Sequence, residues 1–138
     1  MKKLYILLLL LPTTFCYTSC NKEVPSTKIN LIQSKIVDKI WYLDYSITGS
    51  VTRTFVGQPT YFITFLKDGS TKDSDGITGN FSIVNINDKF ELLVNGKTNN
   101  GNNFNYTNLI ESVGDVKMIQ SFMASGQTVK TTLYFTNK

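Results

Sequence analysis

The side chains that most often carry covalent or acid–base chemistry are few in this chain, and they are unevenly placed. The sequence contains no histidine, and its two cysteines, Cys16 and Cys20, both lie near the N-terminus. A Ser-His-Asp or Cys-His arrangement would therefore have no base, and a zinc site would need carboxylates alone. The sequence excludes these classes of enzyme, and we expect a protein that is not an enzyme and uses no metal or cofactor.

Three carboxylates remain as candidates for a general acid and base, namely Asp44, Glu91 and Glu111. Hydrolysis by a carboxylate pair needs the two groups roughly 5 to 10 Å apart, and nothing in the spacing brings any two of these together. The outer face of a strand is the ordinary place for such residues. We expect them to be solvated.

Two short motifs match ligand-binding loops only in part. Residues 96–98 read Gly-Lys-Thr, but the first Gly of a phosphate-binding loop would fall at Glu91. Residues 73–76 read Asp-Ser-Asp-Gly, but the acid that a calcium loop needs at its twelfth position is Val84. A solvated turn is the predicted role of residues 73–76, with a weak calcium site as the alternative.

The N-terminus has the three-part layout of a secretory signal peptide. Lys2 and Lys3 form a charged start, residues 4–11 are an unbroken apolar run, and Pro12 ends that run. The run is too short to cross a membrane, which takes about 20 apolar residues. We expect residues 1–19 to be a signal peptide that is removed.

The next residues resemble the processing site of bacterial lipoproteins, because Thr18 and Ser19 are small and Cys20 follows them. In that family the cysteine receives a diacylglycerol, the chain is cut before it, and the new amine is acylated. Tyr17 stands where the family usually has Leu, and Cys16, preceded by a bulky aromatic residue, is the alternative acceptor. The resemblance implies lipidation at Cys20; an ordinary secreted protein is the alternative.

A triply acylated Cys20 would hold the protein at a membrane, since stable anchoring takes about two lipid signals. Residues 20–28 contain Pro25 among polar neighbours and are predicted to be a lipidated tether. Lys22 and Glu23 loosely resemble the surface-export signal of Bacteroidetes lipoproteins, with a solvated tether as the alternative. We expect a protein of the bacterial outer membrane, facing the periplasm or exposed at the surface.

Removing the signal leaves 119 of the 138 residues, enough for one domain with its own core. Lys2 and Lys3 leave with the signal, so 14 basic and 10 acidic residues become 12 and 10. A net charge of about +2 does not indicate nucleic-acid binding. Both cysteines lie at or before the processing site, so no disulfide forms within the domain. We expect a monomer whose partners are the membrane, through its lipid anchor, and a small apolar molecule.

The remaining chain predicts one short helix followed by strands. Ile29, Ile32, Ile36 and Ile40 recur at three- and four-residue steps, which predicts a helix with one apolar stripe. Alternation of apolar and polar residues, with turn residues between the runs, predicts strands at residues 41–47, 61–66, 77–84, 90–94, 104–112, 116–123 and 128–136.

The connections after residue 57 look like short hairpins, so the strands should be neighbours in sequence order. A sandwich would need long crossings, whereas an up-and-down meander of eight strands closes on itself and removes its exposed edges. Over residues 29–138 we therefore predict an all-β fold, a small antiparallel up-and-down eight-stranded barrel with a short N-terminal helix.

Several of these features together resemble the lipocalin-like lipoproteins of Bacteroidetes. Trp41 opens the first strand, residues 61–69 read Tyr-x-Ile-Thr-Phe-x-x-Asp-Gly, and residues 79–81 read Gly-x-Phe. The Gly-x-Trp of true lipocalins is absent, because Lys39 stands where that Gly would be. The resemblance covers residues 29–136; it implies a calyx-like barrel and leaves the ligand open.

A binding site in such a barrel would lie inside it. Eight-stranded barrels are either filled by their own side chains or hold one small ligand. The period-two pattern places the aromatic residues of several strands on one face, and buried tyrosine hydroxyls need polar partners. We predict a small, partly apolar ligand lined by Tyr61, Phe81, Phe90 and Tyr106, with Trp41 as a plug at the closed end.

The alternative function is a filled barrel that binds a protein or glycan through its loops. Residues 48–59 and the Asn-rich residues 95–103 are the candidate loops. Val51, Phe55 and Val56 are more apolar than an idle surface loop requires.

Overall fold

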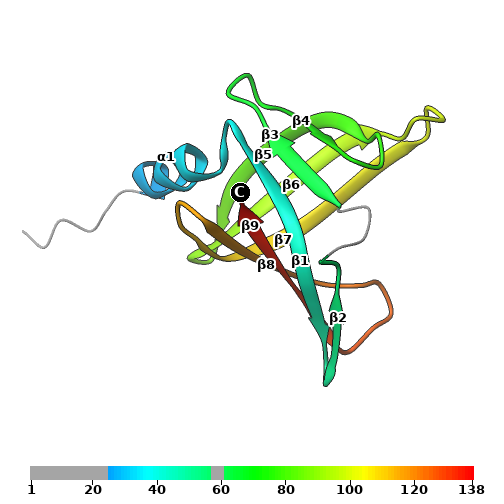
Figure 1. Cartoon of the computed structure of the whole chain (residues 1–138). Helices are drawn as coiled ribbons and strands as arrows, with labels where there is room; N and C mark the ends of the chain where they lie inside the picture. The colour runs from blue at the N-terminus through cyan, green and yellow to red at the C-terminus, as the bar shows by residue number, and fades with distance from the viewer. Residues whose placement is uncertain (1–24, 57–60) are drawn as a thin grey trace, which may run out of the picture.

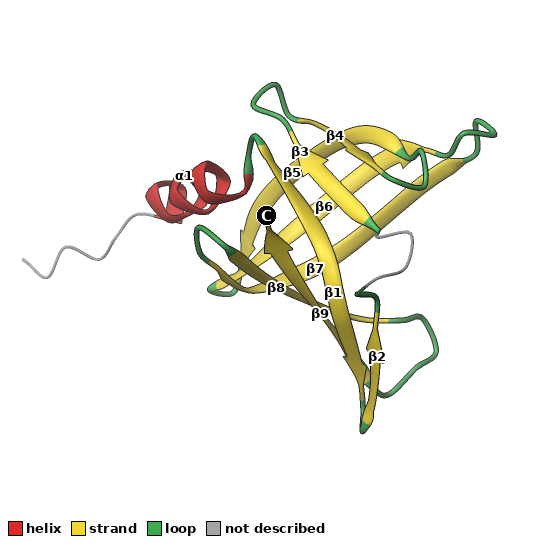
Figure 2. Cartoon of the chain, viewed as in Figure 1, coloured by secondary structure: helices red, strands yellow, loops and turns green. Residues whose placement is uncertain are grey.

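We describe residues 25–56 and 61–138 of the chain from a computed structural model. Within these residues one helix, α1 (Pro25–Ile36), precedes nine strands that follow one another along the chain (Figures 1 and 2). The strands are β1 (Lys39–Thr48), β2 (Val51–Thr54), β3 (Phe62–Phe65), β4 (Ser70–Asp73), β5 (Thr78–Ile86), β6 (Lys89–Lys97), β7 (Asn103–Val113), β8 (Lys117–Met123) and β9 (Lys130–Asn137).

The strands form one antiparallel sheet that closes on itself. From β3 to β9 each strand pairs with its neighbour in sequence, and β1 pairs with both β3 and β9. β2 is an extra strand that pairs with β1 alone among the described elements. The fold is therefore a closed up-and-down barrel of eight strands with one added strand, which confirms the predicted fold class.

The helix lies four residues earlier than the isoleucine pattern predicts. It begins at Pro25, where a missing N–H costs nothing because the first turn of a helix has no partner for it. Residues 25–28, which we expected in the tether, are thus helical, and residues 20–24 lie outside the described residues. Asp38 has a φ of 56° and turns the chain, so Ile40 belongs to β1.

Two short strands are absent from the sequence prediction. β2 has four exposed residues, and β4 reads Ser-Thr-Lys-Asp, so neither shows an apolar alternation. Thr71 of β4 nevertheless faces inward, is buried, and donates its hydroxyl to the Thr64 carbonyl at 2.9 Å. β6 also continues to Lys97, which shortens the loop expected at residues 95–103.

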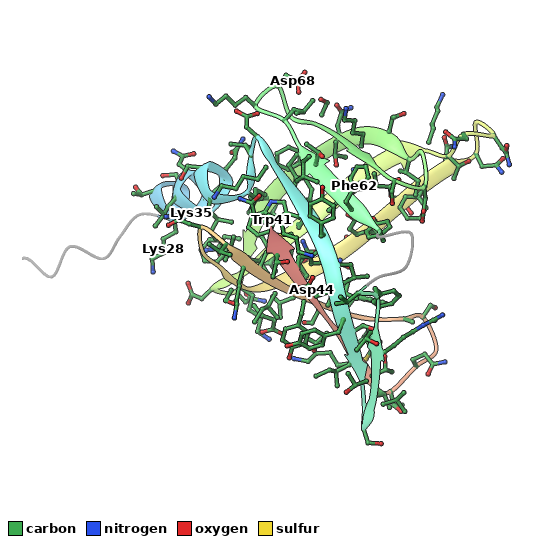
Figure 3. All side chains as sticks on the ribbon, viewed as in Figure 1. Lys28, Lys35, Trp41, Asp44, Phe62 and Asp68 are labelled. Atoms are coloured by element: carbon green, nitrogen blue, oxygen red, sulfur yellow. The ribbon has the colours of Figure 1, made fainter. Side chains whose placement is uncertain are left out.

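One end of the barrel is closed by α1. Trp41 is fully buried beside the helix, and its indole N–H donates to the Ile36 carbonyl at 2.9 Å (Figure 3). Lys35 holds the helix to the β7–β8 turn through an ion pair with Asp115 at 2.6 Å. The prediction that Trp41 plugs the closed end is confirmed.

The other end is open because the sheet divides there. The register of β7 with β8 begins at Leu109 opposite Ser121, so residues 103–108 of β7 pair only with β6. β1 pairs with β3 through Lys39 to Tyr42 and with β2 through Tyr45 to Thr48. We call β3 to β7 the first leaf, and β8, β9, β1 and β2 the second leaf; the two diverge away from α1 (Figure 1).

Irregular pairing accompanies the division. The register shifts between Leu43 and Tyr45 in β1 and between Ile110 and Ser112 in β7. A bulge adds one residue to a strand, bends it and increases its twist. Both shifts lie close to the level at which the leaves begin to separate.

Candidate functional site

A cavity of about 520 Å³ lies between the two leaves. From the first leaf it is lined by Tyr61, Ile63, Asp75, Phe104, Tyr106 and Asn108. From the second leaf it is lined by Leu43, Phe55, Gln120, Phe122, Leu133 and Phe135. Small-molecule sites typically have volumes of roughly 300 to 1,000 Å³ and mostly apolar walls with a few polar groups. The cavity has both properties.

The wall of the cavity is largely aromatic. Half of the twelve lining residues are Phe or Tyr, and they come from both leaves. Phe104 and Tyr106 stand two residues apart on β7 and meet edge to face, with ring centroids 5.6 Å apart. Such rings offer large apolar area with little conformational freedom to lose on binding.

Two amide side chains lie side by side where β7 and β8 separate. Asn108 is 6% exposed and Gln120 is 2% exposed. Asn108 Nδ2 donates to Gln120 Oε1 at 2.8 Å, and Gln120 Nε2 donates to the thioether sulfur of Met118 at 3.2 Å. We call Asn108 and Gln120 the amide pair; it joins the two leaves at the inner end of the cavity.

The amide pair has hydrogen-bonding capacity to spare. Each carboxamide has two N–H donors and one oxygen acceptor. Among the described residues, no group donates to Asn108 Oδ1, and each amide has one N–H without a partner. Among the described residues the one fully buried side-chain polar atom without a partner is Thr136 Oγ1, so the spare atoms of the amide pair are open to the cavity. A ligand could pair with them in place of water.

Two tyrosines and a carboxylate meet on the first leaf. The Tyr61 hydroxyl donates to Asp73 Oδ2 at 3.1 Å. Asp73 Oδ1 accepts the backbone N–H groups of Asp75 at 3.0 Å and Ile77 at 2.9 Å, so this carboxylate also shapes the β4–β5 turn. The Tyr106 hydroxyl has no hydrogen-bond partner within residues 25–56 and 61–138.

Both tyrosines are neutral phenols at physiological pH. Burial raises the pKa of Tyr61, and the neighbouring Tyr106 and Asp73 raise it further. Burial likewise raises the pKa of Tyr106, with Asp73 as the second cause. Since an ordinary tyrosine titrates near about pH 10, neither hydroxyl carries a charge into the cavity.

The structure brings together two of the four predicted lining residues, Tyr61 and Tyr106. Phe81 is buried and meets the Phe65 ring edge to face at 5.0 Å, and Phe90 packs on the same core. Neither of these two lines the cavity, so their assignment to its wall is corrected. The period-two pattern predicts which face a residue occupies; it does not predict how far along the barrel axis that residue lies.

The sequence prediction missed the amide pair, and it named no cavity-lining residue on β1, β8 or β9. Asn108 stands between Tyr106 and Ile110 on the inward face of β7, and Gln120 stands between Met118 and Phe122 on that of β8. A polar amide at an inward position of an otherwise apolar face was the available signal. It would have been visible only after the two strands were paired.

Glu111, Asp44 and the Gly-Lys-Thr motif make contacts within the fold and do not line the cavity. Glu111 accepts hydrogen bonds from Lys130 at 2.8 Å and Ser121 at 2.6 Å, and these hold its pKa below the usual range. Asp44 lies 3.8 Å from Lys138. Gly96 is opposite Gly79 in the β5–β6 pair, so the Gly-Lys-Thr motif begins within a strand.

The described residues contain no group of three or more His, Cys, Asp or Glu side chains placed to hold a metal ion. No described helix is long and apolar enough to span a membrane. Cys20, the expected lipidation site, lies outside the described residues. No protein-family model matches the chain, and neither the curated proteins nor the solved structures contain a match to it.

Proposed function

We propose that the protein is a lipid-anchored lipoprotein of the bacterial cell envelope whose barrel binds one small, partly apolar molecule. The cavity between the leaves carries the binding part of this proposal. Small-molecule sites are typically concave, with mostly apolar walls and a few convergent polar groups. A space of about 520 Å³ with an aromatic wall and an incompletely paired amide pair is therefore best explained as a ligand site.

The anchor rests on the sequence, on Thr18-Ser19-Cys20 after an apolar run. α1 begins five residues after Cys20, and an extended chain of that length reaches at most about 18 Å. Because α1 covers the closed end, an anchor at Cys20 would hold that end near the membrane. The two leaves diverge away from α1 (Figure 1), so the cavity between them would then open away from the anchor.

Native mass spectrometry tests the ligand. The segment of residues 21–138, which includes every described element, would be isolated from the periplasm of a bacterial host and weighed before and after denaturation. A mass excess that is lost on unfolding is expected, and it would identify the chemical class of the ligand. Tyr106→Leu should reduce the excess, whereas Tyr42→Leu, a control outside the cavity lining, should retain it. A bare polypeptide mass in every preparation would contradict the proposal.

Lipidation is tested on the whole chain by metabolic labelling with a palmitate analogue. Label and membrane association should be lost in Cys20→Ala and kept in Cys16→Ala. The reverse result would assign the anchor to Cys16. If the parent chain itself took up no label, the protein would be an ordinary secreted protein without a lipid anchor.

A second function is favoured by apolar side chains at the open end. Val51 is 67% exposed and Val56 is 69% exposed, and Met123 and Val129 are also exposed there. Exposed apolar residues gathered at one end of a rigid scaffold suit a protein or glycan partner. The cavity does not support the filled interior that we first combined with this function. Val51→Asp with Val129→Asp should abolish capture of such a partner without unfolding the barrel.

A further inference from the structure

The amide pair can select the kind of polar group that a ligand carries. Its spare groups are one oxygen, Asn108 Oδ1, and one N–H on each amide. These groups belong to side chains that are more than nine-tenths buried and that line the cavity. A ligand group that only donates or only accepts would satisfy part of this set. A hydroxyl or a carboxamide does both.

The charges around the cavity argue against an anionic ligand. Asp75 is the one charged side chain among the described lining residues, and residues 57–60 contain no charged residue. The tyrosine hydroxyls are neutral, and the chain has no histidine. An ionised carboxylate at the amide pair would lose its water without gaining an opposite charge, which is costly in an apolar site.

A cationic ligand group would also find no opposite charge at the inner end of the cavity. The carboxylate of Asp75 belongs to the exposed β4–β5 turn at the open end, whereas the amide pair lies where the leaves join. Arg53 is also at the open end, where its guanidinium lies 5.5 Å from the centre of the Phe55 ring. Charged groups of either sign are therefore placed at the open end.

The rest of the cavity suits an apolar body. Phe104 and Phe122 stand on opposite leaves beyond the amide pair, toward the open end of β7 and β8. A molecule that placed a polar group at the amide pair would pass its remaining atoms between these rings. This orientation buries both parts of the molecule against surfaces of matching polarity.

We infer that the ligand has a neutral head group that both donates and accepts hydrogen bonds, a hydroxyl or a carboxamide on an apolar body, and that this head group enters first and pairs with Asn108 and Gln120. The inference rests on the proposed binding function. It adds the class of molecule and its direction in the cavity.

The test compares four ligands with the same number of carbon atoms, ten, and different head groups: decanamide, decan-1-ol, decanoate and decylammonium. The whole processed chain, held in solution by an amphipathic polymer, is titrated with each by calorimetry at about pH 8, where decanoate is ionised. Decanamide and decan-1-ol should bind at least about tenfold more tightly than decanoate or decylammonium, because two net hydrogen bonds are worth roughly that factor.

Variants of the amide pair locate the preference. Asn108→Leu should remove the advantage of decanamide, whereas Asn105→Leu, an exposed position on the same strand, should keep it. Gln120→Met, which conserves volume, is the second variant and should act in the same direction. An unchanged advantage of decanamide in both amide-pair variants would overturn the inference.

The outcomes also distinguish a failure of this inference from a failure of the proposed ligand binding. Tighter binding of decanoate, lost in Arg53→Gln, would show an anionic head at the open end and overturn the inference while binding stands. Tighter binding of decylammonium, lost in Asp75→Asn, would do the same for a cationic head. If none of the four ligands binds, the proposed binding function itself fails.

Discussion

The closed half and the open half of this barrel are built from the same strands, yet their interiors differ. Near α1 the inward side chains fill the space: Trp41, Phe65 and Met118 are fully buried. Beyond the amide pair the inward side chains are as apolar, but they stand on leaves that have separated, and a cavity of about 520 Å³ remains.

The difference shows that backbone geometry, more than residue type, decides whether this barrel is filled. Phe104, Phe122 and Leu133 would make an ordinary core if β7 and β8 paired along their full lengths. The register shifts in β1 and β7 accompany the separation of the leaves. We expect the closed half to supply stability and the open half to supply binding, and each prediction below tests that division.

The largest effect is expected from Trp41→Ala at the closed end. This change removes a fully buried side chain and its hydrogen bond to Ile36, so it should lower the free energy of unfolding by about 3 to 5 kcal/mol. Phe122→Ala in the open half should cost only about 1 to 2 kcal/mol, because that ring is half-buried and already faces the cavity. Urea denaturation measures both. Equal losses would show that the two halves are equally packed.

The amide pair should sharpen the contrast between stability and binding. Replacing both members, Asn108→Leu with Gln120→Leu, exchanges both partners of a hydrogen bond for apolar side chains and should change the free energy of unfolding by no more than about 1 kcal/mol. The same protein should lose its preference for a polar head group. Denaturant unfolding and calorimetric titration test the two parts, and a large loss of stability would mean that the pair holds the leaves together.

The two cavity tyrosines form a matched comparison within the first leaf. Tyr61→Phe removes a hydrogen bond to Asp73 and should cost about 0.5 to 1.5 kcal/mol in the free energy of unfolding. Tyr106→Phe should cost almost nothing, because no other described residue pairs with its hydroxyl. Thermal or urea unfolding distinguishes the two. A comparable cost for Tyr106→Phe would show that its hydroxyl has a partner in the folded protein.

The sequence predicted the fold well and the site only in part, for related reasons. Alternation of apolar and polar residues is a local signal, and it identified β1, β3 and the strands from β5 to β9. It missed β2 and β4, whose short sequences carry no such alternation. It also placed Tyr61 and Phe81 on the inner face alike, although only Tyr61 reaches the cavity. Depth along the barrel depends on register and bulges, which arise from pairing between strands and not from any one of them.

The smallest effect is expected from the ion pair that fastens α1 to the closed end. The hydrogen bond from Lys35 holds the pKa of Asp115 below its usual range, and the charges of Lys35 and Lys39 act in the same direction. A carboxyl whose pKa is lower in the folded protein adds stability above its unfolded pKa of about 3.9, and that stability is lost as the pH falls through the folded pKa.

Asp115→Asn should therefore be slightly less stable than the parent protein at neutral pH, and the two should converge in acid. Because the Asp115 side chain is 71% exposed and that of Lys35 is 34% exposed, the difference should be small and should shrink further in high salt. Urea unfolding across the range from about pH 2 to pH 7 measures it. A difference that persisted at the acid end could not come from this ion pair, and the attachment of α1 would then rest on the packing of Ile29, Ile32 and Ile36 against the core.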